Sequence, residues 1–156
     1  MKRAVTAAAL TLAAAMPAFA DHHARPTKDE IGANFDRWKA ALATKNPDTV
    51  SALFAPTAVL QPTVSNDMRE KPEEVKAYFV DFLKLSPVPT VNERNIQILD
   101  DNTAVEAGIW TFDLTRDGKP EWVTARYTFV WEKVGKEWKI QLLHSSKMPE
   151  PLAKRP

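Results

Sequence analysis

Residues 103–133 read TAVEAGIWTFDLTRDGKPEWVTARYTFVWEK. The hydrophobic side chains on either side of the centre recur with a period of two, which is typical of half-buried β-strands. Asp117-Gly118 lies between the two halves and is the strongest short signal for a β-hairpin turn. The stretch therefore predicts two long antiparallel strands, Thr103 to Thr115 and Glu121 to Lys133.

The same period extends on both sides of this hairpin. Val91 to Leu99 forms an earlier strand, separated from the hairpin by the polar turn at residues 100–102. Trp138 to Ser146 forms a later strand, which follows the turn Val134-Gly135-Lys136. Together these segments predict a four-stranded antiparallel meander.

The region before residue 90 follows the period of a helix instead. Thr27 and Glu30 form a capping box for a helix that extends to about Lys45. A short helix after Pro47, a short strand at residues 58–60 and a helix beginning at Pro72 follow. Helices and strands that are segregated along a chain indicate an α+β protein. We expect a cone-shaped fold in which the N-terminal helices pack on a strongly curved antiparallel sheet, with a cavity at the wide end.

The first twenty residues have the pattern of a signal peptide. Lys2 and Arg3 precede an apolar stretch, and Ala18-Phe19-Ala20 fits the small-x-small cleavage rule. We therefore predict a signal peptide at 1–20, a flexible leader at 21–26, a single domain at 27–150 and a loose tail at 151–156. The mature protein is then periplasmic or secreted, with no membrane association after cleavage.

Composition excludes several classes of function. Without Lys2 and Arg3 the chain has 19 basic and 20 acidic residues, a formal charge of −1, which argues against nucleic-acid binding. The absence of cysteine excludes thiolate catalysis and cysteine-ligated metal. No GxGxxG pattern is present, so we expect no flavin or nicotinamide cofactor, and no other cofactor is indicated.

Several local motifs resemble the nuclear-transport-factor-2-like superfamily. They include Phe35-Asp36-Arg37-Trp38, residues 53–60 (LFAPTAVL), residues 125–131 (ARYTFVW) and residues 135–149, which contain GKEWKI and HSSKMP. Within the superfamily the chain is similar to bacterial proteins related to the calcium/calmodulin-dependent protein kinase II association domain, in the SnoaL-like and SgcJ/EcaC groups. The resemblance implies a pocket and a homo-oligomer, a dimer or larger ring formed through the sheet. It does not imply kinase activity, because the chain has no Gly-rich loop, HRD or DFG motif.

Two residues of the last strand are candidates for the pocket. Strict alternation places His144 and Ser146 on the same face as Trp138, Ile140 and Leu142. On that face His144 is either an acid/base or ligand-binding group, or a core histidine that fixes the strand.

Two charged residues within the sheet are further candidates. Arg126 lies in the middle of a strand and needs either an acidic partner, such as Glu106 or Asp113, or an anionic ligand. Glu106 shares a face with Trp110 and is either a catalytic carboxyl group of raised pKa or the structural partner of Arg126. Tyr78 and Trp110 supply aromatic surface that lines the pocket, fills the core or covers an oligomer interface.

His22 and His23 suggest a separate metal site. After cleavage the chain begins Asp21-His22-His23, and a free amine, two backbone nitrogens and an imidazole at the third position suit Cu(II) or Ni(II). The alternative is a solvated tail without function.

Three functions remain compatible with the sequence. The first is a homo-oligomeric module that binds a small, possibly anionic, ligand through Arg126 and His144. The second is a SnoaL-like isomerase or hydro-lyase in which His144 acts with Glu106. The third is a pure oligomerisation domain.

Overall fold

The computed structural model describes residues 25–150 and 154–156. The expected signal peptide, most of the leader and the His22–His23 pair lie outside the described residues. Among the residues that are described, no helix is both long and hydrophobic enough to cross a membrane.

Helix α1 (Lys28–Ala43) begins where the capping residues predict. The Thr27 hydroxyl accepts a hydrogen bond from the Glu30 amide at 3.1 Å, which satisfies one free N–H of the first turn. The Glu30 carboxylate does not complete the capping box, because it accepts a 2.9 Å hydrogen bond from the Trp138 indole instead. This bond ties the start of the helix to the last strand of the sheet.

Two further helices follow, each with proline in its first turn. They are α2 (Pro47–Ser51), capped by the Asn46 side chain, and α3 (Pro72–Phe82), which continues into a short 3-10 helix, η1 (Leu83–Leu85). Ser86 ends η1 in the left-handed conformation, at a φ of 51°.

The sheet has five strands rather than the four of the expected meander. The order is β1-β5-β4-β3-β2, and the bounds are β1 (Phe54–Gln61), β2 (Val88–Ile98), β3 (Thr103–Arg116), β4 (Lys119–Val134) and β5 (Glu137–Lys147). The four later strands form the predicted antiparallel meander. The fifth strand, β1, is longer than the predicted strand at 58–60. It pairs parallel with β5, and the chain between them, which includes α3 and the other three strands, is long enough for the crossover that parallel pairing needs.

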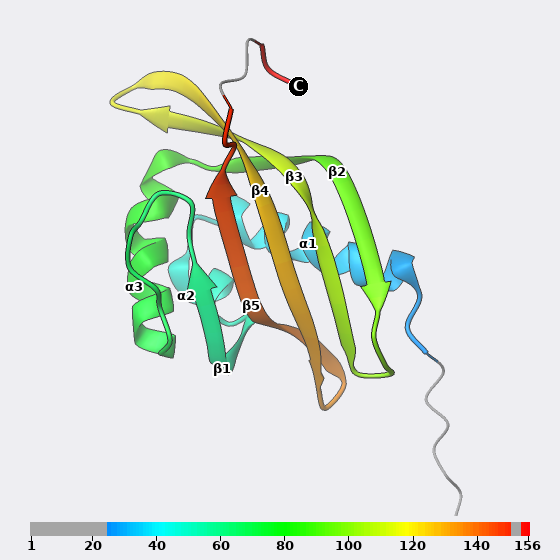
Figure 1. Ribbon diagram of the computed structural model, residues 1–156. Helices are drawn as coiled ribbons and strands as arrows, with labels where there is room; N and C mark the ends of the chain where they lie inside the picture. The colour runs from blue at the N-terminus through cyan, green and yellow to red at the C-terminus, as the bar shows by residue number, and fades with distance from the viewer. Residues whose placement is uncertain (1–24, 151–153) are drawn as a thin grey trace, which may run out of the picture.

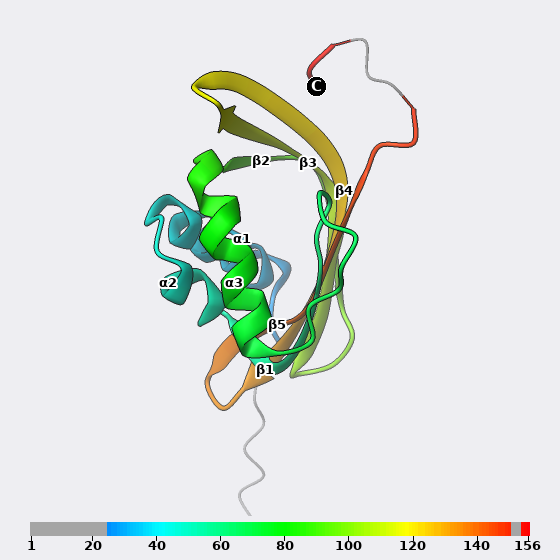
Figure 2. The same cartoon turned by 90° about the vertical axis from the view of Figure 1, so that its left-hand side faces the viewer.

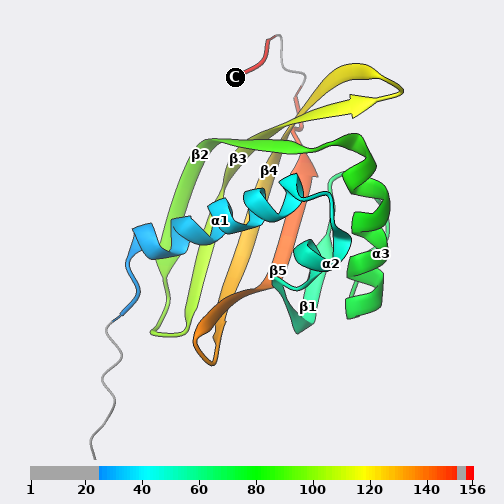
Figure 3. The ribbon, with the colours of Figure 1, turned by 180° about the vertical axis from the view of Figure 1, so that it is seen from behind.

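All the helices lie on one face of the sheet, so the molecule has two layers (Figures 1 and 2). Figure 3 shows α1 crossing the strands and α3 beside it at the β1 edge. The β3–β4 hairpin curls toward the helical layer (Figure 2), so the sheet has a concave face toward the helices and a convex face away from them. The prediction of an α+β fold with a strongly curved sheet is confirmed.

Two β-bulges interrupt the antiparallel pairings and bend the strands that carry them. One lies at Asn92 in β2 and one at Gln141 in β5, where the pairing shifts by one residue. Opposite the first bulge the chains approach closely, since a Cβ added at Gly108 would lie 1.9 Å from the Glu93 carbonyl oxygen. Glycine is therefore required at this position.

Aromatic rings fill the space between α1 and the concave face. The Trp38 and Trp110 rings are stacked with centroids 5.3 Å apart and planes 8° apart. The Tyr127 ring also stacks on Trp110, and the centroids of these two rings are 4.6 Å apart. Parallel rings at this distance contribute about 0.5–1.5 kcal/mol per pair in addition to the burial of their surface.

Candidate ligand-binding pocket

The bulge in β5 decides which of its side chains face the concave side. Trp131 of β4 pairs with Ile140, but the next residue, Val130, pairs with Leu142, so Gln141 is the extra residue. Beyond the bulge, Leu143 and Ser145 are buried, whereas His144 is exposed and Ser146 only partly buried. The prediction that His144 and Ser146 share the inner face was wrong, because strict alternation does not hold through a bulge.

Arg126 also lies on the convex face and not in the pocket. It is exposed, and its cross-strand neighbours there are Ile109 and Ser146. Neither predicted acidic partner pairs with it, because Glu106 pairs with Arg94 and Asp113 with Arg155. An exposed guanidinium is hydrated, so it requires neither a buried partner nor a ligand.

Glu106 is on the inner face with Trp110, as predicted, and its carboxylate is fully buried. Three donors satisfy it: Arg94 Nε at 2.9 Å, the Tyr127 hydroxyl at 3.2 Å and Trp131 Nε1 at 3.2 Å. The Arg94 guanidinium also lies 5.2 Å from the centre of the Phe35 ring. Burial raises the pKa of Glu106 above its ordinary value, and the charge of Arg94 and the three hydrogen bonds oppose that rise.

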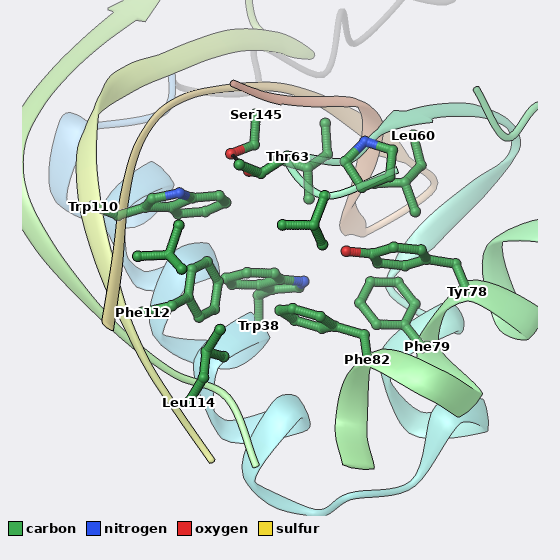
Figure 4. A pocket seen from close by; sticks show the side chains of 14 residues that line it. Trp38, Leu60, Thr63, Tyr78, Phe79, Phe82, Trp110, Phe112, Leu114 and Ser145 are labelled. Atoms are coloured by element: carbon green, nitrogen blue, oxygen red, sulfur yellow. Dashed lines mark hydrogen bonds between the residues drawn. The ribbon is translucent and has the colours of Figure 1, made fainter. Parts of the chain in front are cut away.

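A separate pocket lies between the concave face, α3 and the segment that follows β1 (Figure 4). From the helices, its walls are the rings of Trp38, Tyr78, Phe79 and Phe82. From the sheet, they are Trp110, Phe112, Leu114, Val123, Leu143 and Ser145. Leu60, Pro62, Thr63 and Val64 close the remaining side. Tyr78 and Trp110, predicted from the sequence as pocket candidates, therefore both line one cavity.

Two hydrogen-bond donors in this pocket have no partner. The indole Nε1 atoms of Trp38 and Trp110 are both buried, and neither forms a hydrogen bond with any described residue. In Figure 4 the Trp38 nitrogen points toward the middle of the pocket, where the Tyr78 hydroxyl also ends, and the Trp110 nitrogen lies on the edge of its ring toward Ser145. Buried donors are nearly always paired in proteins, so two in one cavity indicate a place for an acceptor.

The polar groups of the pocket are uncharged. None of the side chains that line it is acidic, basic or a histidine. Burial raises the pKa of the Tyr78 hydroxyl well above its ordinary value, so this group stays protonated at neutral pH. The hydroxyl groups of Thr63 and Ser145 form a short hydrogen bond with each other at the edge of the pocket.

The enclosed part of the pocket is small and has an open mouth. It encloses about 40 Å³, and the hollow reaches about 490 Å³ when the space open to solvent is included. Val64, Tyr78 and Phe82 line both the pocket and an adjoining surface hollow, to which Arg116 contributes. These three residues therefore form the mouth.

The predicted site residues thus fall into three separate groups. Tyr78 and Trp110 lie in the pocket, Glu106 is bound within its own network, and Arg126, His144 and Ser146 lie on the convex face. No cluster of three or more metal-binding side chains occurs in the described ranges.

Four residues of the pocket and of the Glu106 network were not predicted from the sequence: Trp38, Thr63, Ser145 and Arg94. The sequence could have predicted Trp38 as a pocket residue, because a tryptophan on the apolar face of an amphipathic helix packs against the sheet. It could not have predicted Thr63 and Ser145, because the direction of these side chains depends on a loop and on a bulge.

Comparison with known proteins agrees with this architecture. The calcium/calmodulin dependent protein kinase II association domain matches residues 27–149. A Xanthomonas campestris protein, described as a candidate domain of this kind, is 47% identical; the match covers 88% of this chain and 95% of that chain with a TM-score of 0.79. No curated protein matches the chain.

More distant structures share the fold. A nuclear transport factor 2-like superfamily protein from Salmonella enterica is 19% identical, with coverage of 83% and 96% and a TM-score of 0.69. The association domain of C. elegans CaMKII is 20% identical, with coverage of 77% and 95% and a TM-score of 0.64.

The helical layer on a curved sheet gives the chain the α+β fold of nuclear transport factor 2-like proteins. Within this class it belongs to the calcium/calmodulin dependent protein kinase II association domain family.

The Arg94–Glu106 pair makes stability depend on pH. We expect Arg94→Met to lower the free energy of unfolding by about 3 kcal/mol at neutral pH, because it leaves a buried carboxylate without its cation. The pKa of Glu106 lies above 4.5 in the folded protein, so its contribution to stability is greatest in acid and is lost as the pH rises through the folded pKa. The deficit of Arg94→Met should therefore shrink as the pH falls toward 4.5. Urea unfolding of both proteins at a series of pH values measures this difference in the free energy of unfolding.

Arg116→Met is the matched control, since Arg116 and Glu121 form an exposed pair at 2.9 Å. Its effect should stay below about 1 kcal/mol at every pH. A deficit of Arg94→Met that does not change with pH would contradict the assignment.

Proposed function

We propose that this protein is a self-associating, exported module whose aromatic pocket binds a small molecule. The observation that carries the proposal is the pair of unpartnered indole N–H groups of Trp38 and Trp110 in one cavity. An orphaned buried donor costs about 1–3 kcal/mol, and a ligand that accepts from it recovers that free energy. Binding rather than catalysis is favoured, because no acid/base residue lines the pocket and Glu106 is already bonded to three donors.

A block at the mouth tests ligand binding. In wild-type protein a ligand at a hundred times its Kd should raise Tm by about 5–10 °C. We expect Val64→Trp to abolish this rise, because the larger side chain fills the mouth, while the Tm without ligand changes little at a position that is 46% exposed. A thermal-shift screen of uncharged and anionic small molecules measures both quantities.

Met68→Trp is the control, because Met68 is equally exposed but lies outside the pocket. It should keep every ligand-induced shift. If no compound raises the Tm of the wild-type protein, the binding part of the proposal fails and association alone remains.

The convex face supports self-association. Its centre has three rows of side chains across β3, β4 and β5: Val105–Val130–Leu142, Ala107–Thr128–His144 and Ile109–Arg126–Ser146. The first row is entirely apolar although it is only partly buried, and partly exposed apolar side chains that lie together are typical of an interaction surface. Membership of an association-domain family points to a second copy of the chain as the partner.

A charge on this face tests the association. We expect Val130→Lys to convert the oligomer to a monomer, because two copies of an uncompensated ammonium would be desolvated in the interface. Light scattering coupled to gel filtration measures the mass. Leu99→Lys, at an exposed position in the β2–β3 turn, should leave the mass unchanged. An oligomer that survives Val130→Lys would exclude the convex face as the interface.

Export is supported by Lys2, Arg3 and the Ala18-Phe19-Ala20 motif. N-terminal sequencing of the protein recovered from the periplasm of a bacterial host should begin at Asp21. The same measurement shows whether the amine needed for a copper site with His22 and His23 is free. Recovery of an uncleaved chain from the cytoplasm would exclude both.

A further inference from the structure

The unpartnered indoles restrict which ligands the pocket accepts. An indole N–H can donate a hydrogen bond but cannot accept one. Trp38 is 1% exposed and its nitrogen is buried, so only a group inside the pocket can reach it. The matching group is therefore an acceptor, such as a carbonyl oxygen, that enters ahead of the rest of the ligand. The Tyr78 hydroxyl, which ends in the same part of the pocket in Figure 4, can donate to the same acceptor.

Charge disfavours an anionic ligand. A carboxylate inside the pocket would lose its hydration and find no cation among the described lining residues, which costs more than uncharged hydrogen-bond donors return. Arg69, whose charge acts on the Tyr78 hydroxyl, lies outside the lining and is already bonded to Asp67 and Ser65. Arg116, which lines the hollow outside the mouth, already pairs with Glu121 at 2.9 Å. The earlier expectation of an anionic ligand depended on Arg126, and Arg126 is on the opposite face of the sheet.

Size and shape indicate where the rest of the ligand lies. The enclosed 40 Å³ is far below the roughly 150 Å³ of a dry cavity that holds benzene. A ring therefore cannot enter the enclosed part, which accommodates only a group of a few atoms. The mouth is lined by Tyr78 and Phe82, whose rings are stacked at 5.5 Å, and by Val64. These side chains offer an apolar surface to a ring.

We propose that the pocket selects uncharged ring compounds with a carbonyl substituent, whose oxygen accepts a hydrogen bond from Trp38 Nε1 while the ring lies in the mouth. This inference rests on the proposed binding function and adds the class of ligand. It predicts discrimination between molecules of nearly equal size that differ only in charge or in the acceptor.

Three probes of similar size separate these properties. Acetophenone has the ring and the carbonyl, ethylbenzene lacks the acceptor, and benzoate carries a charge. We expect acetophenone to bind about threefold to tenfold more tightly than ethylbenzene, as one net hydrogen bond allows. Benzoate should bind at least about tenfold more weakly than acetophenone at neutral pH. Titrations followed by two-dimensional ¹⁵N–¹H NMR give each Kd, and the indole N–H resonance of Trp38 should move with acetophenone far more than with ethylbenzene.

Variants assign the effect to individual groups. Trp38→Phe removes the donor, so the preference for acetophenone over ethylbenzene should fall to about twofold or less, and loss of its indole resonance assigns that peak. Tyr78→Phe removes only a hydroxyl group and preserves the ring, so it should fold normally and lower the same preference less. Arg116→Gln should change no affinity. If Trp38→Phe does not fold, the three probes and Tyr78→Phe still decide the question in otherwise intact protein.

The outcomes distinguish the two proposals. Equal affinity for acetophenone and ethylbenzene, or tighter binding of benzoate, would overturn the ligand class but leave a pocket that binds small molecules. Benzoate binding that disappears in Arg116→Gln would place an anion at the mouth and also overturn the ligand class. Binding of none of the three probes would overturn the ligand class, and the thermal-shift screen then decides whether the pocket binds anything else.

Discussion

The stack of Trp38 on Trp110 is the contact on which the rest of this molecule depends. It joins α1, which crosses the strands (Figure 3), to the centre of the sheet, and the two ring planes are 8° apart. The sheet curves around α1, and α3 lies beside this helix at the β1 edge, with the pocket between α3 and the concave face (Figures 2 and 3). The pocket lies where large rings pack against this curved surface and leave about 40 Å³ unfilled.

The two groups of buried polar side chains on the concave side differ in whether their hydrogen bonds are satisfied. Glu106 is an acceptor surrounded by donors, and its partners Arg94, Tyr127 and Trp131 complete a closed network. In the pocket the situation is reversed, because the indole donors of Trp38 and Trp110 have no acceptor among the described residues. A closed network stabilises one arrangement of the core, whereas an open set of donors is a stability cost that binding can remove. One face of the sheet therefore carries both a closed polar network and, separately, a set of donors without acceptors among the described residues.

The helices and the antiparallel strands could be predicted from the sequence, because the spacing of hydrophobic residues depends only on neighbouring positions in the chain. The helix from Thr27, the hairpin at Asp117-Gly118 and the meander all follow from it. The parallel pairing of β1 with β5 was not predicted, since it joins segments far apart along the chain. Tyr78 and Trp110 were among the pocket candidates, but the sequence left pocket lining, core filling and an oligomer interface as alternatives, because the position of the cavity depends on contacts between distant segments. His144 was assigned to the wrong face because a bulge has no sequence signature in a single chain.

That bulge has a consequence for how this strand tolerates change in length. In a regular strand the loss of one residue rotates every later side chain to the opposite face. In β5 the loss of Gln141 would instead straighten the strand, and Leu143 and Ser145 would still face the cavity while His144 still faced outward. The extra residue can therefore be lost without changing which side chains face the cavity. Relatives of different length can therefore keep the same cavity wall, provided that the deletion falls at this one position.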